Sequence, residues 1–210
     1  MLTLYFSPGA ASLCVHHLLI ELGVEHQLQR VDTSKGEQKT EAYLKLNPGG
    51  VVPTLVVDDM PMVESAAMLM WLSSNDPQRR FSPEPGSPEE RLYLSWFLLL
   101  ANGLQPAFRQ WFYPQEAAGE AATDGAKACA RERIENLFAR IDSQLASTDG
   151  YLCGEQPHAV DFFLFMLMRW SRNMPRPATT WPACAAFVAR MKARPSFAEL
   201  YAREGLTEWS

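Results

Sequence analysis

Apolar and polar positions change period several times within the first 76 residues. The apolar and aromatic run Leu2–Phe6 ends in the turn sequence Ser7-Pro8-Gly9 and predicts a buried first strand. From Leu13 the apolar positions recur at helical spacing as far as Gly23, a suitable C-cap. Strand-like alternation then resumes over His26–Val31. The chain therefore begins with a strand, a helix and a second strand.

A short helix, a hairpin and a further helix are predicted next. Their positions are Glu41–Leu46, the strands Val51–Val57 and Met60–Val63, and a helix from Ser65 onward. The resulting order βαβαββα over residues 1–76 describes a compact α/β domain with helices packed against a mixed sheet.

The rest of the chain is almost wholly helical after a break. The segment Asp76–Pro88 carries four prolines among polar residues, so we assign residues 77–88 to a linker. Residues 89–210 are predicted to form an all-helical bundle domain. Its helices are expected at Glu89–Gly103, Thr123–Ala146, Val160–Arg172, Trp181–Ala193 and Phe197–Tyr201.

Charge and composition exclude several classes of function. The 210 residues are 47% hydrophobic with a formal net charge of −5. The sequence shows no cluster of basic residues that would bind the phosphate backbone of a nucleic acid. No apolar run approaches the roughly 20 residues that a membrane helix requires. The N-terminus reads directly as a strand, without the pattern of a signal peptide. We therefore expect a cytoplasmic protein that binds neither nucleic acid nor membrane.

The cysteines give no sign of a metal or redox site. They lie far apart, form no C-x-x-C pair and are expected to be core thiols: Cys14, Cys129, Cys153 and Cys184. With no ligand cluster and no glycine-rich phosphate loop, the sequence predicts neither a metal nor a nucleotide cofactor.

The segment from Asn47 to Leu55 gives the first sign of a family. Its sequence, Asn-Pro-Gly-Gly-Val-Val-Pro-Thr-Leu, resembles the segment before the hairpin in the glutathione S-transferase superfamily. The resemblance spans the whole chain, implies a thioredoxin-like first domain, and implies a cis peptide between Val52 and Pro53. Such a bond leaves the backbone N–H and C=O of Val52 free to bind the cysteinyl unit of glutathione. An ordinary trans proline at the start of a strand is the alternative.

Three further residues are implied to bind glutathione. Glu64-Ser65 resembles the acid-serine pair of the family, in which the carboxylate pairs with the γ-glutamyl ammonium and the serine binds the α-carboxylate. Ser65 serves equally well as a helix cap, and the two roles are compatible. Lys35 looks like the basic residue that reaches the glycyl carboxylate, with a solvated loop lysine as the alternative.

The first turn points to the bacterial beta-class enzymes and also departs from them. Residues Phe6–Leu13 resemble the turn of that class, but Ala11 stands where the class has a cysteine. The histidine and lysine of the class correspond to Ala101 and Asn102. Thiol exchange is therefore in doubt unless Cys14 replaces the missing cysteine.

Three hydroxyl groups near this turn are candidates for activating the thiol of glutathione. Ser12 ranks first because it starts the first predicted helix, as the serine of other transferase classes does. Tyr5 and Ser7 are rivals on one face of the first strand. Lowering the thiol pKa by two units requires about 2.7 kcal/mol, which one charge-assisted hydrogen bond nearly supplies, at about 1.5 to 3 kcal/mol.

The helical domain supplies candidates for binding the second substrate. Phe108, Arg109 and Trp111 belong to an aromatic and cationic stretch that the family layout places over the ligand cleft. Plain interdomain or dimer core is the alternative for each. Gly154–Asp161 resembles the helix-capping motif of the family, with His158 in place of the hydroxyl residue. This motif supports the fold rather than the chemistry.

The sequence thus predicts a homodimeric glutathione transferase with a role in detoxification. Glutathione, as co-substrate, would attack a small electrophile through its ionised thiol. Two alternatives remain open: a glutathione-dependent peroxidase or thiol-disulfide reductase, and a non-catalytic interaction protein with the transferase fold.

Overall fold

The structure is a computed structural model that describes residues 1–148 and 150–209. The chain forms two compact units. Unit 1 consists of Met1–Ser82 together with the C-terminal segment that begins at Lys192, and unit 2 consists of Pro83–Met191. Among the described residues, no helix combines the length and the hydropathy needed to span a lipid bilayer.

Unit 1 contains the predicted βαβαββα order. The elements are β1 (Leu2–Phe6), α1 (Leu13–Leu22), β2 (His26–Arg30), α2 (Glu41–Leu46), β3 (Thr54–Val57), β4 (Met60–Met62) and α3 (Ser65–Ser74), with 3₁₀ turns at Thr33–Lys35 and Glu37–Lys39. The sheet order is β2-β1-β3-β4, in which β1 pairs parallel with β2 and antiparallel with β3. The mixed sheet and the predicted fold class are confirmed.

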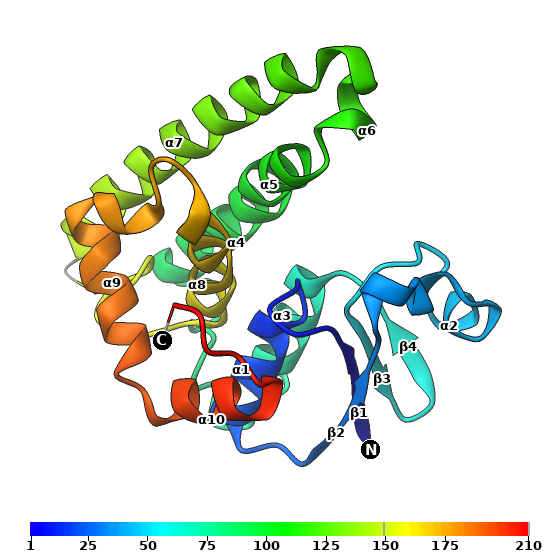
Figure 1. The fold of residues 1–210 in the computed structure, drawn as a ribbon. Coiled ribbons are helices and arrows are strands. Elements are labelled where there is room, and N and C mark those ends of the chain that lie inside the picture. The colour runs from blue at the N-terminus through cyan, green and yellow to red at the C-terminus, as the bar shows by residue number, and fades with distance from the viewer. Residues whose placement is uncertain (149, 210) are drawn as a thin grey trace. The chain divides into compact units, whose positions relative to one another are not determined.

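Alternation along β1 decides which face of the sheet forms the core. Leu4 and Phe6 are buried, whereas Tyr5 between them is partly exposed. Helices α1 and α3 lie side by side on the face of the sheet that carries Leu4 and Phe6, and α2 lies on the opposite face (Figure 1). The third strand starts at Thr54 rather than at Val51, because Pro53 has no N–H for the ladder and follows a cis peptide bond.

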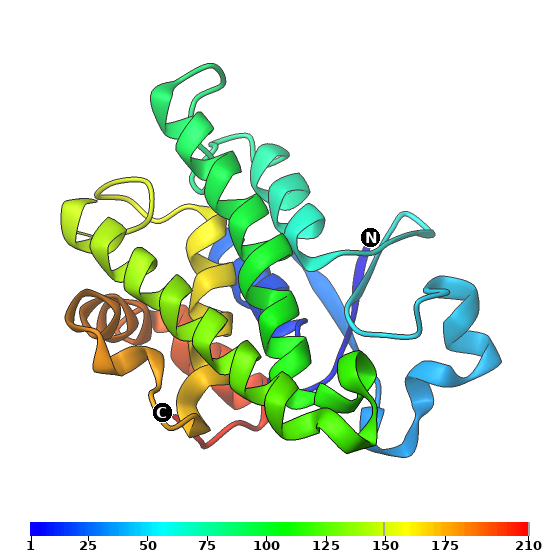
Figure 2. The same cartoon turned by 90° about the horizontal axis from the view of Figure 1, so that it is seen from above.

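Unit 2 is a set of helices. They are α4 (Pro88–Leu99), α5 (Gln105–Phe112), α6 (Pro114–Ala118), α7 (Thr123–Thr148), α8 (Ala159–Trp170) and α9 (Pro182–Lys192), with short 3₁₀ turns at Glu120–Ala122, Ser171–Asn173 and Ala178–Thr180. Helices α5 and α7 pack side by side (Figure 2). The centre of α8, from Phe162 to Met168, is no more than 1% exposed and forms the core of the unit.

The first helix of unit 2 differs from its predicted form. A π-helical segment, Leu100–Leu104, joins α4 directly to α5, so the aromatic stretch belongs to a helix of its own. Pro106 has no N–H to donate to Asn102, which removes one α-helical hydrogen bond and favours the wider turn. No sequence period reveals such a one-residue change in helical pitch.

The C-terminal segment packs within unit 1. Helix α10 (Pro195–Glu204) extends beyond the predicted Phe197–Tyr201 and lies against α1 (Figure 1). The end of the expected linker also belongs to this unit, because Phe81 is buried and Ser82 donates a hydrogen bond to the Ser73 carbonyl at 3.1 Å. The compact units therefore differ from the predicted boundaries 1–76, 77–88 and 89–210 at both ends.

Candidate functional site

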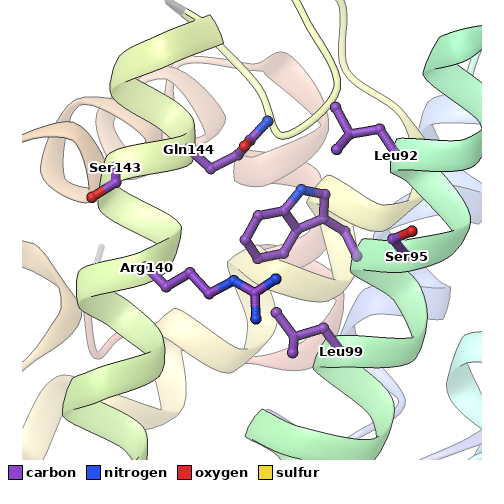
Figure 3. A pocket seen from close by; sticks show the side chains of 7 residues that line it. Leu92, Ser95, Leu99, Arg140, Ser143 and Gln144 are labelled. Carbon is purple, nitrogen blue, oxygen red and sulfur yellow. The ribbon is translucent and has the colours of Figure 1, made fainter.

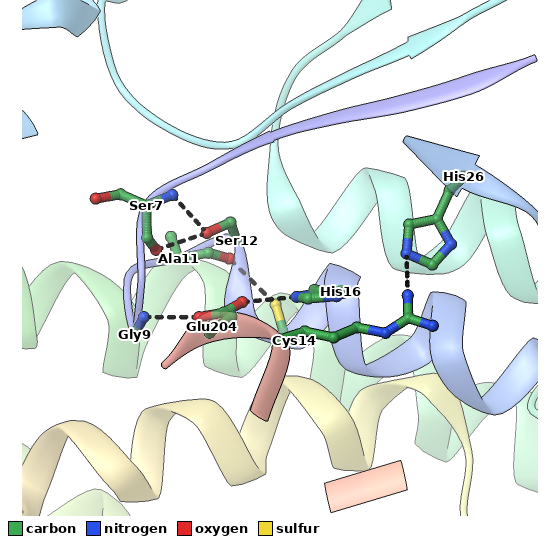
Figure 4. A network of polar contacts seen from close by, with 9 residues as sticks. Ser7, Gly9, Ala11, Ser12, Cys14, His16, His26 and Glu204 are labelled. Carbon is green, nitrogen blue, oxygen red and sulfur yellow. Dashed lines mark hydrogen bonds and ion pairs between the residues drawn. The ribbon is translucent and has the colours of Figure 1, made fainter. Parts of the chain in front are cut away.

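The turn between β1 and α1 is closed by the Ser12 side chain (Figure 4). The Ser12 hydroxyl accepts the N–H of Ser7 at 3.3 Å and donates its proton to the Ser7 carbonyl at 3.1 Å. Ser12 is fully buried, and Ser7 is 8% exposed. Gly9, in the left-handed region at φ 68°, reverses the chain between them. The structure therefore brings Ser7 and Ser12 together, with the Ser12 proton engaged by the backbone.

Tyr5, the third hydroxyl candidate, lies on the other face of the sheet from Leu4. Its ring meets Tyr43 of α2 edge-on, with 5.9 Å between ring centroids. The Tyr43 hydroxyl donates to the Val51 carbonyl at 2.8 Å and lies 2.9 Å from the Thr54 hydroxyl. Tyr5 therefore belongs to the side of the sheet that carries the Val52–Pro53 segment.

The start of α1 presents backbone donors. Among the described residues, the N–H groups of Ala11 and Ser12 make no hydrogen bond, as is usual for the first turn of a helix. The Ala11 carbonyl accepts hydrogen bonds from the Ser65 hydroxyl at 3.0 Å and from the Cys14 thiol at 3.3 Å. Cys14 is only 1% exposed, and burial raises the pKa of its thiol. An anion at this helix start would meet donors, whereas Cys14 is a poor source of thiolate.

The peptide bond between Val52 and Pro53 is cis, as predicted. Within the described part of the chain, the backbone N–H and C=O of Val52 have no hydrogen-bond partner. The preceding residue is fixed, because the Val51 carbonyl accepts hydrogen bonds from the Asn47 amide and the Tyr43 hydroxyl, both at 2.8 Å. Val52 therefore presents a free backbone edge on a rigid support.

Glu64 and Ser65 stand at the start of α3. Glu64 has φ 71° and ψ 109°, a conformation that costs a non-glycine residue about 1–3 kcal/mol. Its side chain is exposed, whereas Ser65 is 4% exposed. The hydrogen bond from Ser65 to the Ala11 carbonyl joins the start of α3 to the start of α1. Two predicted parts of the site, far apart in sequence, are thus neighbours within unit 1.

Two lysines lie in the loop region after β2. Lys35 is exposed and pairs with Asp32 at 3.0 Å. Hydrogen bonds from Ser34 and Lys35 lower the pKa of Asp32 to about 2. Lys39, which is not among the predicted site residues, extends its Nζ to within 3.4 Å of the Gly49 carbonyl, in the loop before Val52. Only the tertiary structure reveals this second cation, because nothing in the local sequence separates the two lysines.

The aromatic residues of unit 2 divide into buried and exposed members. Phe108 is fully buried, with Phe138 and Trp170 edge-on to it at 6.2 and 5.8 Å. Arg109 is half-exposed and forms a two-pronged ion pair with Glu116 at 2.7 and 2.5 Å.

The remaining candidates of unit 2 have more exposed surroundings. Trp111 is partly exposed beneath the ammonium group of Lys127, which lies 4.6 Å from its ring. Ala101 and Asn102 fall on the π-helical segment, with Asn102 exposed.

A separate hollow of about 340 Å³ lies between α4 and α7 (Figure 3). Its lining includes the Trp96 ring and the guanidinium of Arg140, 5.5 Å apart. None of the predicted site residues lines it. Over the described ranges 1–148 and 150–209, no group of three or more His, Cys, Asp or Glu side chains is arranged to hold a metal ion.

Known proteins resemble both parts of the chain. Residues 10–75 match the profile described as glutathione S-transferase, N-terminal domain, and residues 94–203 match the corresponding C-terminal domain. Glutathione S-transferase GstA of Escherichia coli O157:H7 is 27% identical over 97% of this chain and 98% of its own length. Glutathione S-transferase GST-4.5 of Xanthomonas campestris pv. campestris is 30% identical over the same shares.

Solved structures agree with these relatives. A glutathione transferase homologue from Sulfitobacter, with bound glutathione, superposes with a TM-score of 0.89 at 26% identity, covering 99% of both chains. A beta-class glutathione S-transferase from Sphingomonas chungbukensis superposes with a TM-score of 0.85 at 27% identity, covering 98% of this chain and all of the other. With both domain profiles matched and near-complete coverage of its relatives, the chain belongs to the glutathione S-transferase family.

Proposed function

We propose that this protein is a glutathione transferase that binds the tripeptide on unit 1 and ionises its thiol at the turn between β1 and α1. The observation that carries the proposal is the 3.0 Å hydrogen bond from Ser65 to the Ala11 carbonyl. It joins the proposed γ-glutamyl end of the site to the helix start where the thiol is to be activated.

The proposed binding contacts use groups that the fold leaves available. Val52 offers a backbone N–H and C=O to the cysteinyl unit, held in place by the cis bond to Pro53. The exposed carboxylate of Glu64 pairs with the γ-glutamyl ammonium, and the start of α3 at Ser65 receives the α-carboxylate. Lys35 is proposed for the glycyl carboxylate, after exchanging its partner Asp32 for the ligand.

Activation of the thiol needs only groups of this turn. A thiolate near the start of α1 would receive the free N–H groups of Ala11 and Ser12. The Ser12 proton, now donated to the Ser7 carbonyl, turns to the sulfur, so a neutral hydrogen bond is exchanged for a stronger charge-assisted one. Ser7 and Tyr5 remain the rival donors.

The second substrate is proposed to be a small electrophile bound by residues of unit 2. The exposed part of Trp111 supplies apolar surface, and Arg109 can exchange Glu116 for a carboxylate of the substrate. Phe108 supports this stretch from within the aromatic cluster.

A cytoplasmic, detoxifying homodimer is part of the proposal. Large apolar side chains on the surface of α4, Leu94 at 38% and Leu98 at 60% exposure, are suited to contact a second copy of the chain. Leu98→Asp should then shift the protein to the monomer in sedimentation analysis. A monomeric parent protein would remove this part of the proposal and leave the glutathione site standing.

The test is the ultraviolet absorbance of the bound thiolate, titrated against pH. We expect the parent protein to lower the pKa of bound glutathione by about two units below the free value near 8.5. Ser12→Ala should lose most of the shift, whereas Ser7→Ala and Tyr5→Phe should keep it. Ser74→Ala is the matched control, because its hydroxyl also bonds to backbone, at the far end of α3.

The outcome also separates the alternative functions. Glutathione bound with an unshifted pKa would favour the non-catalytic interaction protein. Turnover that survives in Ser12→Ala, together with a mixed disulfide on the protein, would favour the peroxidase or reductase. The structure favours the peroxidase or reductase less, because the Cys14 thiol that it would use is buried and bonded to the Ala11 carbonyl.

A further inference from the structure

A carboxylate from the C-terminal helix supports the turn that carries Ser7 and Ser12 (Figure 4). Glu204 Oε2 accepts the Gly9 N–H at 2.8 Å, and Oε1 accepts the Nδ1–H of His16 at 2.8 Å. The side chains of Glu204 and His16 are both fully buried. We propose that Glu204 is a positioning residue, which holds the turn in the geometry that ionises the thiol of glutathione. This inference rests on the proposed function.

Apart from its two hydrogen bonds, Glu204 lies at a position that is unfavourable for a carboxylate. It is the last residue of α10, directly before Gly205 in the left-handed conformation, where the helix dipole disfavours negative charge. Burial adds a desolvation cost. The two contacts with Gly9 and His16 offset these costs, and both partners belong to the turn and to α1.

The Gly9 contact adds a support from α10 to the turn that Ser12 closes. Inside the turn, the Ser12 hydroxyl and the Ala10 N–H both bind Ser7. Beyond the residues of the turn itself, the Gly9 N–H donates to the Glu204 carboxylate of α10 at 2.8 Å. Since Gly9 has a flexible backbone, loss of the outer contact lets the peptide rotate and shifts Ser12 and the Ala11 N–H relative to the sulfur.

The opposite end of the contact between α1 and α10 provides an internal control. Glu21 of α1 binds Arg194 through two hydrogen bonds of 2.5 and 2.8 Å and also accepts the Ser196 hydroxyl. These contacts attach the start of α10 to α1 without touching the turn. Methionine in place of Glu21 therefore weakens the attachment of the helix and leaves the turn with its own support.

The experiment compares Glu204→Met, Glu204→Gln and Glu21→Met. Met and Gln match Glu in length and are both uncharged, but only Gln retains an oxygen that accepts the Gly9 N–H. Two signals are recorded: the pKa of glutathione bound to each protein, from thiolate absorbance, and the Gly9 amide proton resonance of ¹⁵N-labelled protein without ligand. Thermal unfolding of each variant reports how far α10 has loosened.

If Glu204 positions the turn, the two uncharged variants Glu204→Met and Glu204→Gln should give different results. Glu204→Met should raise the pKa of bound glutathione by about 0.5 to 1 unit, a three- to tenfold lower ratio of thiolate to thiol. Its Gly9 amide resonance should move upfield. Glu204→Gln should stay near the parent protein in both signals, and Glu21→Met should lower the unfolding temperature with both signals unchanged.

Three results would overturn the proposal. Equal downward shifts of the thiol pKa in Glu204→Met and Glu204→Gln would show that the carboxylate acts only through its charge. Parent-like signals in Glu204→Met would show that the turn needs no outer support. An equal loss in Glu21→Met would assign the effect to docking of α10 as a whole.

Two controls keep these results separable from other failures. If Glu204→Met does not fold, Glu204→Asp keeps the charge and withdraws the carboxylate from Gly9, and it should show the same two losses. If the parent protein leaves the thiol of glutathione unshifted, the proposed function fails, whereas the Gly9 resonance still reports whether Glu204 holds the turn.

Discussion

Helices α1 and α8 are both almost completely buried, mainly through apolar side chains, but the middle turns of the two helices differ. The centre of α8 buries only apolar side chains, from Phe162 to Met168. Helix α1 buries two adjacent histidines, His16 and His17, against polar groups of α10. Apolar packing depends on volume and tolerates small displacements, whereas hydrogen bonds specify direction. The centre of α8 should therefore be sensitive to cavities, and the middle of α1 also to pH and to single polar atoms.

The largest effect is expected from a cavity in α8. Phe163 is fully buried, and its ring stacks on Phe97 with 6.1 Å between centroids. Phe163→Ala should lower the free energy of unfolding by about 3–5 kcal/mol, because the removed ring leaves a void that the neighbours only partly fill. Denaturant unfolding measures this loss.

Phe112→Ala is the control on the same type of residue. Phe112 is 47% exposed, so its truncation should lower the free energy of unfolding by only about 1 kcal/mol. Similar losses in the two variants would show that α8 is not the apolar core on which unit 2 depends.

A smaller effect, with a pH dependence, is expected at His17. Its Nε2–H donates to Ser196 at 2.9 Å, because the Ser196 proton goes to Glu21. Burial, assisted by the charges of Arg194 and His16 and opposed by that of Glu21, lowers the pKa of His17 to about 3. Below about pH 6.5 the unfolded chain therefore binds a proton that the folded protein refuses. The contribution of His17 to the free energy of unfolding is therefore fully present above about pH 6.5 and is lost as the pH falls from 6.5 towards 3.

The expected loss through His17 is about 2 kcal/mol between pH 7 and pH 5. Burial also lowers the pKa of His26 and His158, so the parent protein should lose more than this share. His17→Gln keeps an N–H donor for Ser196 and removes the titration. The free energies of unfolding of the parent protein and of His17→Gln, measured from pH 8 to pH 5, should therefore move closer together as the pH falls. A difference that stays constant with pH would contradict the burial of a neutral imidazole.

The same contrast explains what the sequence could predict. Apolar periodicity located most strands and helices, because that signal lies within a few neighbouring residues, whereas the cis bond at Val52–Pro53 was implied by the resemblance of residues 47–55 to the family. The capping motif likewise survives with His158, since Asp161 accepts its N–H at 2.8 Å. Local physical chemistry is sufficient for helices, strands and caps, and the cis bond needed the family resemblance as well.

Contacts over long sequence separations could not be predicted in this way. In the sequence, Glu204 looks like any other charged residue of an amphipathic helix. Its contact with Gly9, 195 positions away, exists only in the folded protein. The buried state of Phe108 and the attachment of α10 to unit 1 depend in the same way on tertiary packing. The engagement of the Ser12 hydroxyl by Ser7 is local, but it requires the left-handed Gly9, which the sequence permits without demanding.

The smallest effect is expected at Cys14, the remaining chemically reactive group of α1. It is 1% exposed, its thiol donates to the Ala11 carbonyl at 3.3 Å, and burial raises its pKa. Cys14→Ala should cost about 1 kcal/mol of stability and leave the pKa of bound glutathione unchanged. Exposed Cys129 on α7 is the matched control for reactivity.

Alkylation measures the difference between these two thiols. In the folded protein, iodoacetamide should modify Cys129 and spare Cys14, because only a thiolate with access to solvent reacts. Denaturation should make all four cysteines reactive. If Cys14 reacted in the folded protein as fast as Cys129, or if Cys14→Ala abolished the shift of the glutathione thiol, α1 would supply a redox group. The thiol-disulfide reductase would then become the better account of a turn that has alanine at position 11.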